Sequence, residues 1–388
     1  MTPAAEIRAA AGRSLTIAVC VPQVPFVSGG AEEQAASLCR ELRTRGHRAE
    51  LVSLPYKWYP RSQLWRSIKM WELADLGESD GRRIDLVIAT KFPSYFVKHD
   101  RRVLWLTHQY RQLYDLYGTP YSDYNPARWR DRRLRRRFVA RDTAALARYA
   151  RRFTISANTR ERMRRYNGLE AETLYPPPKL AGRVQCLEYG DFILSVGRLN
   201  RMKRTEGLLY ALALTKTAAR AVIAGTGPEE GRLKQLTHDL GLAARVEFAG
   251  YVDDDRLIDL YGRCLGVFFA PLDEDYGYIT LEAFLAAKPV LTCNDSGGSW
   301  DPDFVTMNLG ISNCAPLIFA QIPTFYSQTF QWNQTARRIP KDIDVFVGVA
   351  MSHNERGEVG EHALTGRFCR VSLSEGEIAW IFGAPLRY

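Results

Sequence analysis

Two glutamates separated by seven residues carry the strongest chemical signal in the sequence. They stand in the run Glu274-Asp-Tyr-Gly-Tyr-Ile-Thr-Leu-Glu282, which follows the apolar segment LGVFFAPL and opens the helical segment TLEAFLAA. Backbone N–H groups at a helix N-terminus lack intrahelical partners and can bind a diphosphate. The N–H groups expected at this N-terminus are those of Gly277, Tyr278, Ile279 and Thr280.

The two carboxylates are expected to have different roles. We expect Glu282 in the first helical turn, where the helix dipole favours a carboxylate and where it can accept hydrogen bonds from two ribose hydroxyls. Glu274 lies in the preceding loop and could grip a sugar. An ordinary carboxylate near a helix N-terminus would explain Glu282 alone, and an ordinary surface loop would explain Glu274 alone. Together these explanations account poorly for both glutamates and the residues between them.

A pair of cations follows another apolar segment. In SVGRLNRMKR, Arg198 and Lys203 come after a strand and a glycine turn. Two fixed cations would stabilise the charge that develops on a leaving nucleoside diphosphate. The neighbouring Arg201 and Arg204 are interpreted as solvated surface bases.

Two glycine loops follow strands. Gly225 and Gly227 stand in AGTGP, and Gly29 and Gly30 stand in SGGAE. Glycine lets a backbone approach a ligand closely, although G-x-G alone usually marks only a tight turn. Neither loop has the full G-x-G-x-x-G pattern and the sequence has no P-loop, which disfavours an oxidoreductase.

These residues sit in an alternation of strand-like and helix-like segments. LTIAVCVP, AELVSLP, IDLVIAT and VLWLTH are strand-like in the first half, and the pattern restarts with DFILSVGRL after Pro176-Pro-Pro178. Such alternation predicts an α/β fold with two units, and ligands of open α/β sheets bind beyond the carboxyl ends of the strands. The expected organisation is a Rossmann-like domain at 14–178, a linker at 179–189, a second Rossmann-like domain at 190–298 and an atypical tail at 299–388.

The motifs in this order resemble those of the family-4 retaining glycosyltransferases with the GT-B fold. The matching motifs are GGAE, VGRL followed by Lys203, AGTGP, the E-x7-E pair and AAKPVLTCNDSGG, and the resemblance covers roughly residues 15–298. It implies two facing Rossmann-like domains with a cleft between them.

The resemblance also implies an activity and roles for particular residues. The activity is transfer of a hexosyl unit, with retention and without a metal or other cofactor, from a UDP- or GDP-sugar to a saccharide or lipid-linked saccharide. Glu274 would contact the donor sugar and Glu282 the ribose, while His108 in WLTHQYR would be the cleft histidine near the reacting sugar. Arg198, Lys203, Gly29 and Gly30 would meet the diphosphate. DDD at 253–255 does not form a metal-binding D-x-D cluster in a convincing context and is interpreted as a helix N-cap.

After residue 298 the chain departs from the family pattern, which leaves alternatives open. A nucleotide-sugar epimerase or a phosphorylase of the same fold is one, and a non-catalytic nucleotide-sugar binder is another because of the atypical tail. The tyrosine-rich segment RQLYDLYGTPYSDY after His108 favours a transferase with a saccharide acceptor.

The net charge of +10 indicates a polyanionic partner or surface. An arginine-rich segment at 128–152 is expected to be one helix with an approximate apolar stripe that includes Trp129, and it could be a solvated face or a contact with an anionic membrane surface. Nucleic acid is disfavoured because no recognised binding motif accompanies the charge.

Seven scattered cysteines and the absence of a secretory segment predict a cytoplasmic protein. A peripheral position on the inner membrane face would fit the basic helix.

Overall fold

The computed structural model divides the chain into two compact units, Met1–Pro176 and Pro177–Tyr388, called unit 1 and unit 2. It describes residues 14–26, 29–215, 217–293 and 295–297, and beyond these three further strands. Both units alternate strands and helices around a mainly parallel sheet, so the predicted α/β class is confirmed. No helix in the described ranges is long and apolar enough to cross a membrane.

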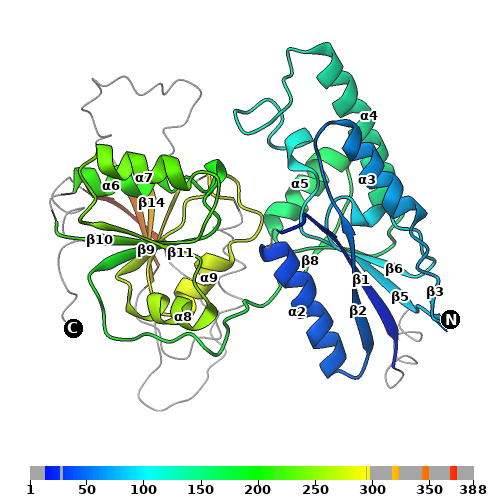
Figure 1. The fold of residues 1–388 in the computed structure, drawn as a ribbon, viewed down its shortest axis with the longest axis horizontal. Helices are drawn as coiled ribbons and strands as arrows, with labels where there is room; N and C mark the ends of the chain where they lie inside the picture. Colours follow the sequence, from blue (N-terminus) through cyan, green and yellow to red (C-terminus); the bar gives the residue numbers. More distant parts are fainter. Residues whose placement is uncertain are drawn as a thin grey trace. The chain divides into compact units, whose positions relative to one another are not determined.

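Unit 1 is built on a six-stranded parallel sheet in the order β2-β1-β5-β6-β7-β8 (Figure 1). The four predicted apolar segments form four adjacent strands of this sheet, β2, β1, β5 and β6. The strands are β1 (Thr16–Gln23), β2 (Arg48–Pro55), β5 (Leu86–Ala89), β6 (Arg102–Leu106), β7 (Arg152–Thr154) and β8 (Glu172–Thr173), with a small hairpin of β3 (Glu78–Ser79) and β4 (Arg82–Arg83).

Helices cover both faces of this sheet because successive strand residues point to opposite sides. On β1, Ala18 and Cys20 belong to a core cluster that includes Trp71 and Phe138. These two aromatic residues come from α3 (Ser62–Leu73) and α4 (Trp129–Leu146). The other face packs against α2 (Gly30–Thr44), while α5 (Ala157–Asn167) follows β7.

The arginine-rich helix is shorter than predicted. It ends at Leu146, and residues from Arg152 form β7, which pairs in parallel with β6. Trp129, expected in the apolar stripe, is 59% exposed. Helical periodicity is a local signal, and it does not reveal that Arg152 lies opposite Leu104 in a sheet.

Unit 2 is built on an eight-stranded sheet in the order β11-β10-β9-β12-β13-β14-β15-β16. Neighbouring strands are parallel as far as β14, and the last two pairings are antiparallel. The strands are β9 (Phe192–Val196), β10 (Arg220–Ala224), β11 (Val246–Gly250), β12 (Gly266–Phe268), β13 (Val290–Cys293), β14 (Leu317–Ile322), β15 (Ile343–Gly348) and β16 (Phe368–Leu373).

Two pairs of helices cover the sheet of unit 2 (Figure 1). On one face, α6 (Glu206–Leu214) and α7 (Glu230–Asp239) contribute Leu209 and Leu233 to one core cluster. On the other, α8 (Asp254–Arg263) and α9 (Tyr278–Leu285) contribute Tyr261 and Phe284 to a second. The predicted N-cap is confirmed, because the Asp253 carboxylate accepts the Arg256 N–H at 2.8 Å.

The segment expected as a linker, 179–189, packs as part of unit 2. Leu180 is 1% exposed in the core that holds Tyr261. Lys179 pairs with Asp254 at 2.8 Å, and Arg183 pairs with Asp255 at the same distance. Of the predicted tail at 299–388, the described residues are those of the three last strands, and the rest of that expectation lies outside them.

Candidate functional site

Glu274 in unit 2 is fixed by the loops that surround it. Its N–H donates to the Ser296 carbonyl at 3.1 Å, and the N–H of Asp273 donates to the Asp295 carbonyl at 2.8 Å. Glu274, in the loop after β12, also forms an isolated parallel bridge with Gly297, in the turn after β13. The backbone of Glu274 is therefore positioned by the segment that follows β13.

Lys203 meets Glu274 directly. Its Nζ lies 2.6 Å from Oε2 of Glu274, and both side chains are about a fifth exposed. The short 3₁₀ helix η3 (Arg201–Lys203) holds Lys203, because the Asn200 side chain accepts the N–H groups of Met202 and Lys203. The structure thus brings together two of the residues singled out from sequence. Arg198, by contrast, is exposed on the loop after β9.

Arg204 is buried, so its interpretation as a solvated surface base is wrong. It is 5% exposed, and its guanidinium binds both carboxylate oxygens of Asp295 at 2.7 and 2.6 Å. It also donates to the carbonyls of Ala270 and Pro271 at 2.7 and 2.9 Å. Arg204 therefore ties η3 to both loops that hold Glu274. Sequence spacing gave no sign of this, because Asp295 lies 91 residues away.

The helix that carries Glu282 begins earlier than predicted. Gly277 caps α9 in a left-handed conformation, with φ of 83°, so Tyr278 is the first helical residue. Glu282 is consequently beyond the first turn, and the expectation of a first-turn carboxylate is wrong. The Thr280 N–H donates to the Gly277 carbonyl at 3.0 Å, so this N–H has a partner within the fold. Ile279 packs on the second core cluster of unit 2.

Glu282 is a buried carboxylate, 8% exposed. The Tyr261 hydroxyl of α8 donates to its Oε2 at 2.9 Å. Burial raises the pKa of Glu282 to about 7, although this hydrogen bond and the charge of Lys179 act to lower it. A carboxyl with this pKa exchanges its proton near neutrality, and a ligand hydroxyl that donates to it would favour the charged form.

The glycines of AGTGP are required by close approach of two loops. A Cβ on Gly225 would lie 2.0 Å from the Gly197 carbonyl oxygen, and one on Gly227 would lie 2.2 Å from that of Leu199. Gly225 also has φ of 137°, which L side chains rarely adopt. The loop after β10 thus packs directly on the loop that carries Arg198, and contact with a donor stays a prediction for both glycines.

Unit 1 holds the remaining predicted residues at the carboxyl ends of its strands. Gly29 caps α2 in an extended conformation and Gly30 begins the helix. Glu32, in the first turn, forms an ion pair with Lys91, which follows β5 and is 9% exposed. Sequence reasoning missed Lys91, although its place directly after the strand IDLVIAT was a usable signal.

His108 follows β6, as predicted. Its Nδ1 lies 2.7 Å from the Gln109 carbonyl. Because a carbonyl can only accept, Nδ1 donates and Nε2 is the basic nitrogen of the neutral ring. A catalytic role for His108 stays a prediction.

The tyrosines after His108 form part of the core of unit 1. Tyr110, Tyr114 and Tyr124 are each less than 9% exposed and belong to its main cluster. The Tyr114 hydroxyl donates to the buried Asp142 at 2.5 Å. These three side chains are therefore part of the core of unit 1 rather than of an exposed surface.

Part of unit 2 matches a family of known proteins. Residues 187–301, which contain Lys203, Glu274 and Glu282, match the family model of glycosyl transferases group 1. This segment is similar to the group 1 glycosyltransferases. The resemblance predicted from the motifs is confirmed. Among the described residues, no group of three or more His, Cys, Asp or Glu side chains is placed to hold a metal ion.

Individual relatives match the chain over segments of similar length. An uncharacterized glycosyltransferase of Methanocaldococcus jannaschii is 36% identical over 107 residues, 27% of each chain. A Campylobacter jejuni enzyme, N-acetylgalactosamine-N,N'-diacetylbacillosaminyl-diphospho-undecaprenol 4-alpha-N-acetylgalactosaminyltransferase, is 33% identical over 104 residues, 27% of this chain and 28% of its own. The match therefore spans just over a quarter of these curated relatives.

Solved structures extend the likeness beyond the group 1 segment. Sucrose-phosphate synthase from Thermosynechococcus elongatus superposes with a TM-score of 0.60 at 16% identity, covering 80% of this chain and 86% of that one. At this identity the likeness concerns the fold. The GT-B fold with two Rossmann-like domains, predicted from the sequence, is confirmed, and the cleft between facing domains stays a prediction.

Proposed function

We propose that the protein is a retaining glycosyltransferase that moves a hexosyl unit from a nucleotide-diphosphate sugar to a saccharide or lipid-linked saccharide. The observation that carries the proposal is the Lys203–Glu274 ion pair, 2.6 Å long, beside the strand ends of a group 1 segment. The Campylobacter jejuni relative is named for a diphospho-undecaprenol-linked acceptor, which supports the acceptor class. Such a reaction would belong to cell-surface polysaccharide synthesis on the cytoplasmic side of a membrane.

The proposed mechanism gives each residue of unit 2 one task. Lys203, with Arg198 on the same loop after β9, would stabilise negative charge on the leaving nucleoside diphosphate. The carboxylate of Glu274, held by its ion pair with Lys203, would bind the donor sugar. Glu282, beyond the first turn of α9, would accept hydrogen bonds from ribose hydroxyls. The leaving phosphate would take the acceptor proton, so the step would need no metal.

In unit 1, the remaining contacts are proposed at the carboxyl ends of β1 and β6. The N-terminus of α2, at Gly29 and Gly30, would approach the diphosphate, and His108 would lie near the reacting sugar. A lipid-linked acceptor would reach unit 1 from an anionic membrane surface that meets the basic helix α4.

A thermal-shift panel of UDP-, GDP-, ADP- and dTDP-sugars tests the donor site. We expect one donor class to stabilise the wild type by about 2.7 kcal/mol at a hundredfold excess over its dissociation constant. Glu282→Ala should abolish that shift. Glu247→Ala, which truncates an exposed glutamate on β11, is the matched control and should keep it. A shift that survives Glu282→Ala would refute the site.

A turnover assay distinguishes a transferase from a non-catalytic nucleotide-sugar binder. Release of nucleoside diphosphate that depends on an acceptor and is lost in Lys203→Met supports transfer. A donor that is bound, with no nucleoside diphosphate released under any acceptor, indicates a non-catalytic binder instead.

A further inference from the structure

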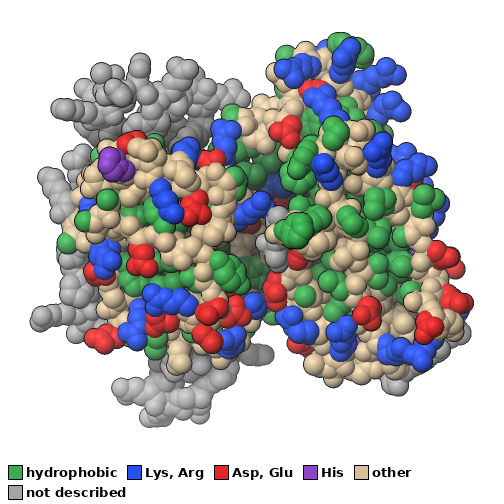
Figure 2. All heavy atoms as spheres, viewed as in Figure 1, with side chains coloured by type: hydrophobic (Ala, Val, Ile, Leu, Met, Phe, Trp, Pro, Cys, Tyr) green, Lys and Arg blue, Asp and Glu red, His purple; other side chains and the backbone are tan. Residues whose placement is uncertain are grey.

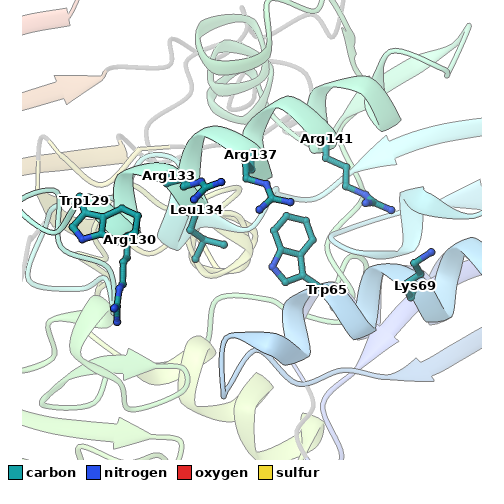
Figure 3. Close-up of a pocket in the computed structure, with 8 residues that line it drawn as sticks. All are labelled: Trp65, Lys69, Trp129, Arg130, Arg133, Leu134, Arg137 and Arg141. Atoms are coloured by element: carbon teal, nitrogen blue, oxygen red, sulfur yellow. The ribbon is translucent and has the colours of Figure 1, made fainter.

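A groove of about 560 Å³ runs between α3 and α4 on the surface of unit 1. Figure 3 shows arginines projecting from successive turns of α4 toward Trp65 on α3, with Lys69 one turn further along α3. Trp129 lies at the N-terminal end of α4. The α3–α4 face is defined here as Trp65, Lys69, Trp129, Arg130, Arg133 and Arg137.

The cations of this face lack acidic partners. Arg141, at the end of the groove, is satisfied by Glu72 at 2.7 and 2.8 Å. Lys69, Arg133 and Arg137, in contrast, form no ion pair with any carboxylate in the described part of the chain. Asp131 of α4 is fully buried and bound to Arg61 and to the Asn125 N–H. The α3–α4 face is therefore a cluster of unneutralised positive charge, and Figure 2 shows Lys and Arg side chains gathered at this end of unit 1.

The spacing of the charges matches a surface more closely than a single anion. Arg130, Arg133 and Arg137 are three or four residues apart, so they share one side of the helix. They extend over about 10 Å at 1.5 Å per residue. A single phosphate group would contact only one or two of these side chains, whereas a row of phosphate headgroups could contact all of them.

Large apolar side chains stand near these charges. Trp129 is 59% exposed. On α3, Leu73 is 77% exposed and lies one turn after Lys69, on the same side of the helix. Tryptophan favours the boundary between lipid headgroups and acyl chains, because it has an apolar body and one polar N–H group. Exposed apolar side chains interleaved with unpaired cations are typical of a helix face that lies on a membrane.

We propose that the α3–α4 face docks on the surface of an anionic lipid bilayer, with Lys69, Arg133 and Arg137 on lipid phosphates and Trp129 at the headgroup boundary. The inference deepens the membrane contact of the proposed function by naming its residues and adding α3 to α4. Docking requires neither donor nor transfer, so its test is independent of activity.

Vesicle co-sedimentation of the full chain without donor tests the docking. We compare vesicles of phosphatidylcholine with vesicles that also contain phosphatidylglycerol, at low and high salt. We expect binding to the anionic vesicles alone, weakened by salt because the charges are exposed. Arg133→Glu with Arg137→Glu should lower the partition coefficient about 30-fold or more, since each cation near an anionic surface contributes about 1 kcal/mol.

Two further variants separate docking from general charge. Arg82→Glu with Arg83→Glu changes the net charge equally at the exposed β3–β4 hairpin and should retain near wild-type binding. Trp129→Ser should weaken binding severalfold without changing any charge. Circular dichroism of each variant verifies folding.

Several outcomes would overturn the proposal. They are equal binding to both kinds of vesicle, equal loss in the hairpin variant, and no binding to either vesicle. Binding of inorganic pyrophosphate or of a single-stranded RNA that is lost in Arg133→Glu with Arg137→Glu, without vesicle binding, would assign the face to a soluble anion or to nucleic acid instead.

Discussion

Units 1 and 2 both place glycines in loops that follow parallel strands. The fold requires glycine at Gly225 in unit 2 but not at Gly29 in unit 1. In unit 2, a Cβ on Gly225 would lie 2.0 Å from a backbone oxygen of the neighbouring loop. In unit 1, the nearest atom to a Cβ on Gly29 is a Glu32 side-chain oxygen at 3.5 Å, an ordinary contact. The same sequence pattern therefore reflects internal packing in unit 2, whereas in unit 1 the fold would accommodate a Cβ at Gly29.

Two carboxylates in helices that follow parallel strands, Glu32 in unit 1 and Glu282 in unit 2, differ in their partners. Glu32 lies in the first turn of α2 and is neutralised by Lys91. Glu282 lies deeper in α9, and its described hydrogen-bond donor is the neutral hydroxyl of Tyr261. Burial raises the pKa of Glu282 to about 7, because its charged form is poorly solvated there. The carboxylate of unit 2 is thus held by a neutral hydrogen-bond donor, whereas that of unit 1 is held by an ion pair.

The largest effect is expected from Arg204→Met, which leaves Asp295 and two loop carbonyls without their donor. Breaking a buried ion pair from one side costs about 3–5 kcal/mol, and the exposure of Asp295 places our expectation at the lower end. Urea unfolding measures the loss. Arg220→Met, at an exposed pair 3.7 Å long, should change stability by less than about 0.5 kcal/mol. Equal stability of the two variants would contradict the role given to Arg204.

Gly225→Ala should cost about 3 kcal/mol, because strain at a positive φ adds to a collision with backbone that cannot move away. Gly231→Ala is the matched control in α7, where a Cβ would meet nothing within 4 Å. There we expect a gain of roughly 0.5–1 kcal/mol from the higher helix propensity of alanine. A tolerated Gly225→Ala would show that the two loops can separate.

The stability difference between wild type and Glu282→Gln should depend on pH. The folded pKa of Glu282, about 7, lies above the ordinary value of 4.5, so folding favours the protonated form. The favourable contribution is full below pH 4.5 and is lost as pH rises through 7, by up to about 3 kcal/mol. Urea unfolding of both proteins at pH 5 and pH 8 measures it. Burial also raises the pKa of Asp142 to about 7. Its contribution to stability is the same in wild type and in Glu282→Gln, so it cancels in the difference between them. A constant difference would place Glu282 in contact with solvent.

The smallest change in stability is expected from Gly29→Ala, about 0.5 kcal/mol, the loss of a glycine N-cap. Its informative readout is donor binding. Under the proposed function the added methyl group would stand where a phosphate approaches α2, and we expect affinity to fall about tenfold, or 1.4 kcal/mol. Thermal shift with the preferred donor measures this, and unchanged affinity would remove Gly29 from the donor site.

Much of the fold could be read from the sequence because its signals are local. Apolar runs such as LTIAVCVP and RAVIAGTG mark strands, and Asp253 before DDRLIDLYGR marks a helix start. Position after a strand also placed Glu274, Lys203 and His108 at the carboxyl ends of parallel strands. The end of α4 was missed because Arg152 joins a strand whose partner lies about fifty residues earlier.

The sequence by itself determined which residue types follow which strands, and with them the α/β class and the glycosyltransferase resemblance. Only the tertiary structure decided which of those residues touch. Sheet order brings the loops after β9, β10 and β12 together, so Gly225 meets Gly197 and Lys203 meets Glu274. It likewise buried Arg204 against Asp295 and Glu282 against Tyr261. The physical reason is that periodicity reports how a segment faces its own core, whereas burial and pairing depend on segments that are far apart in the chain.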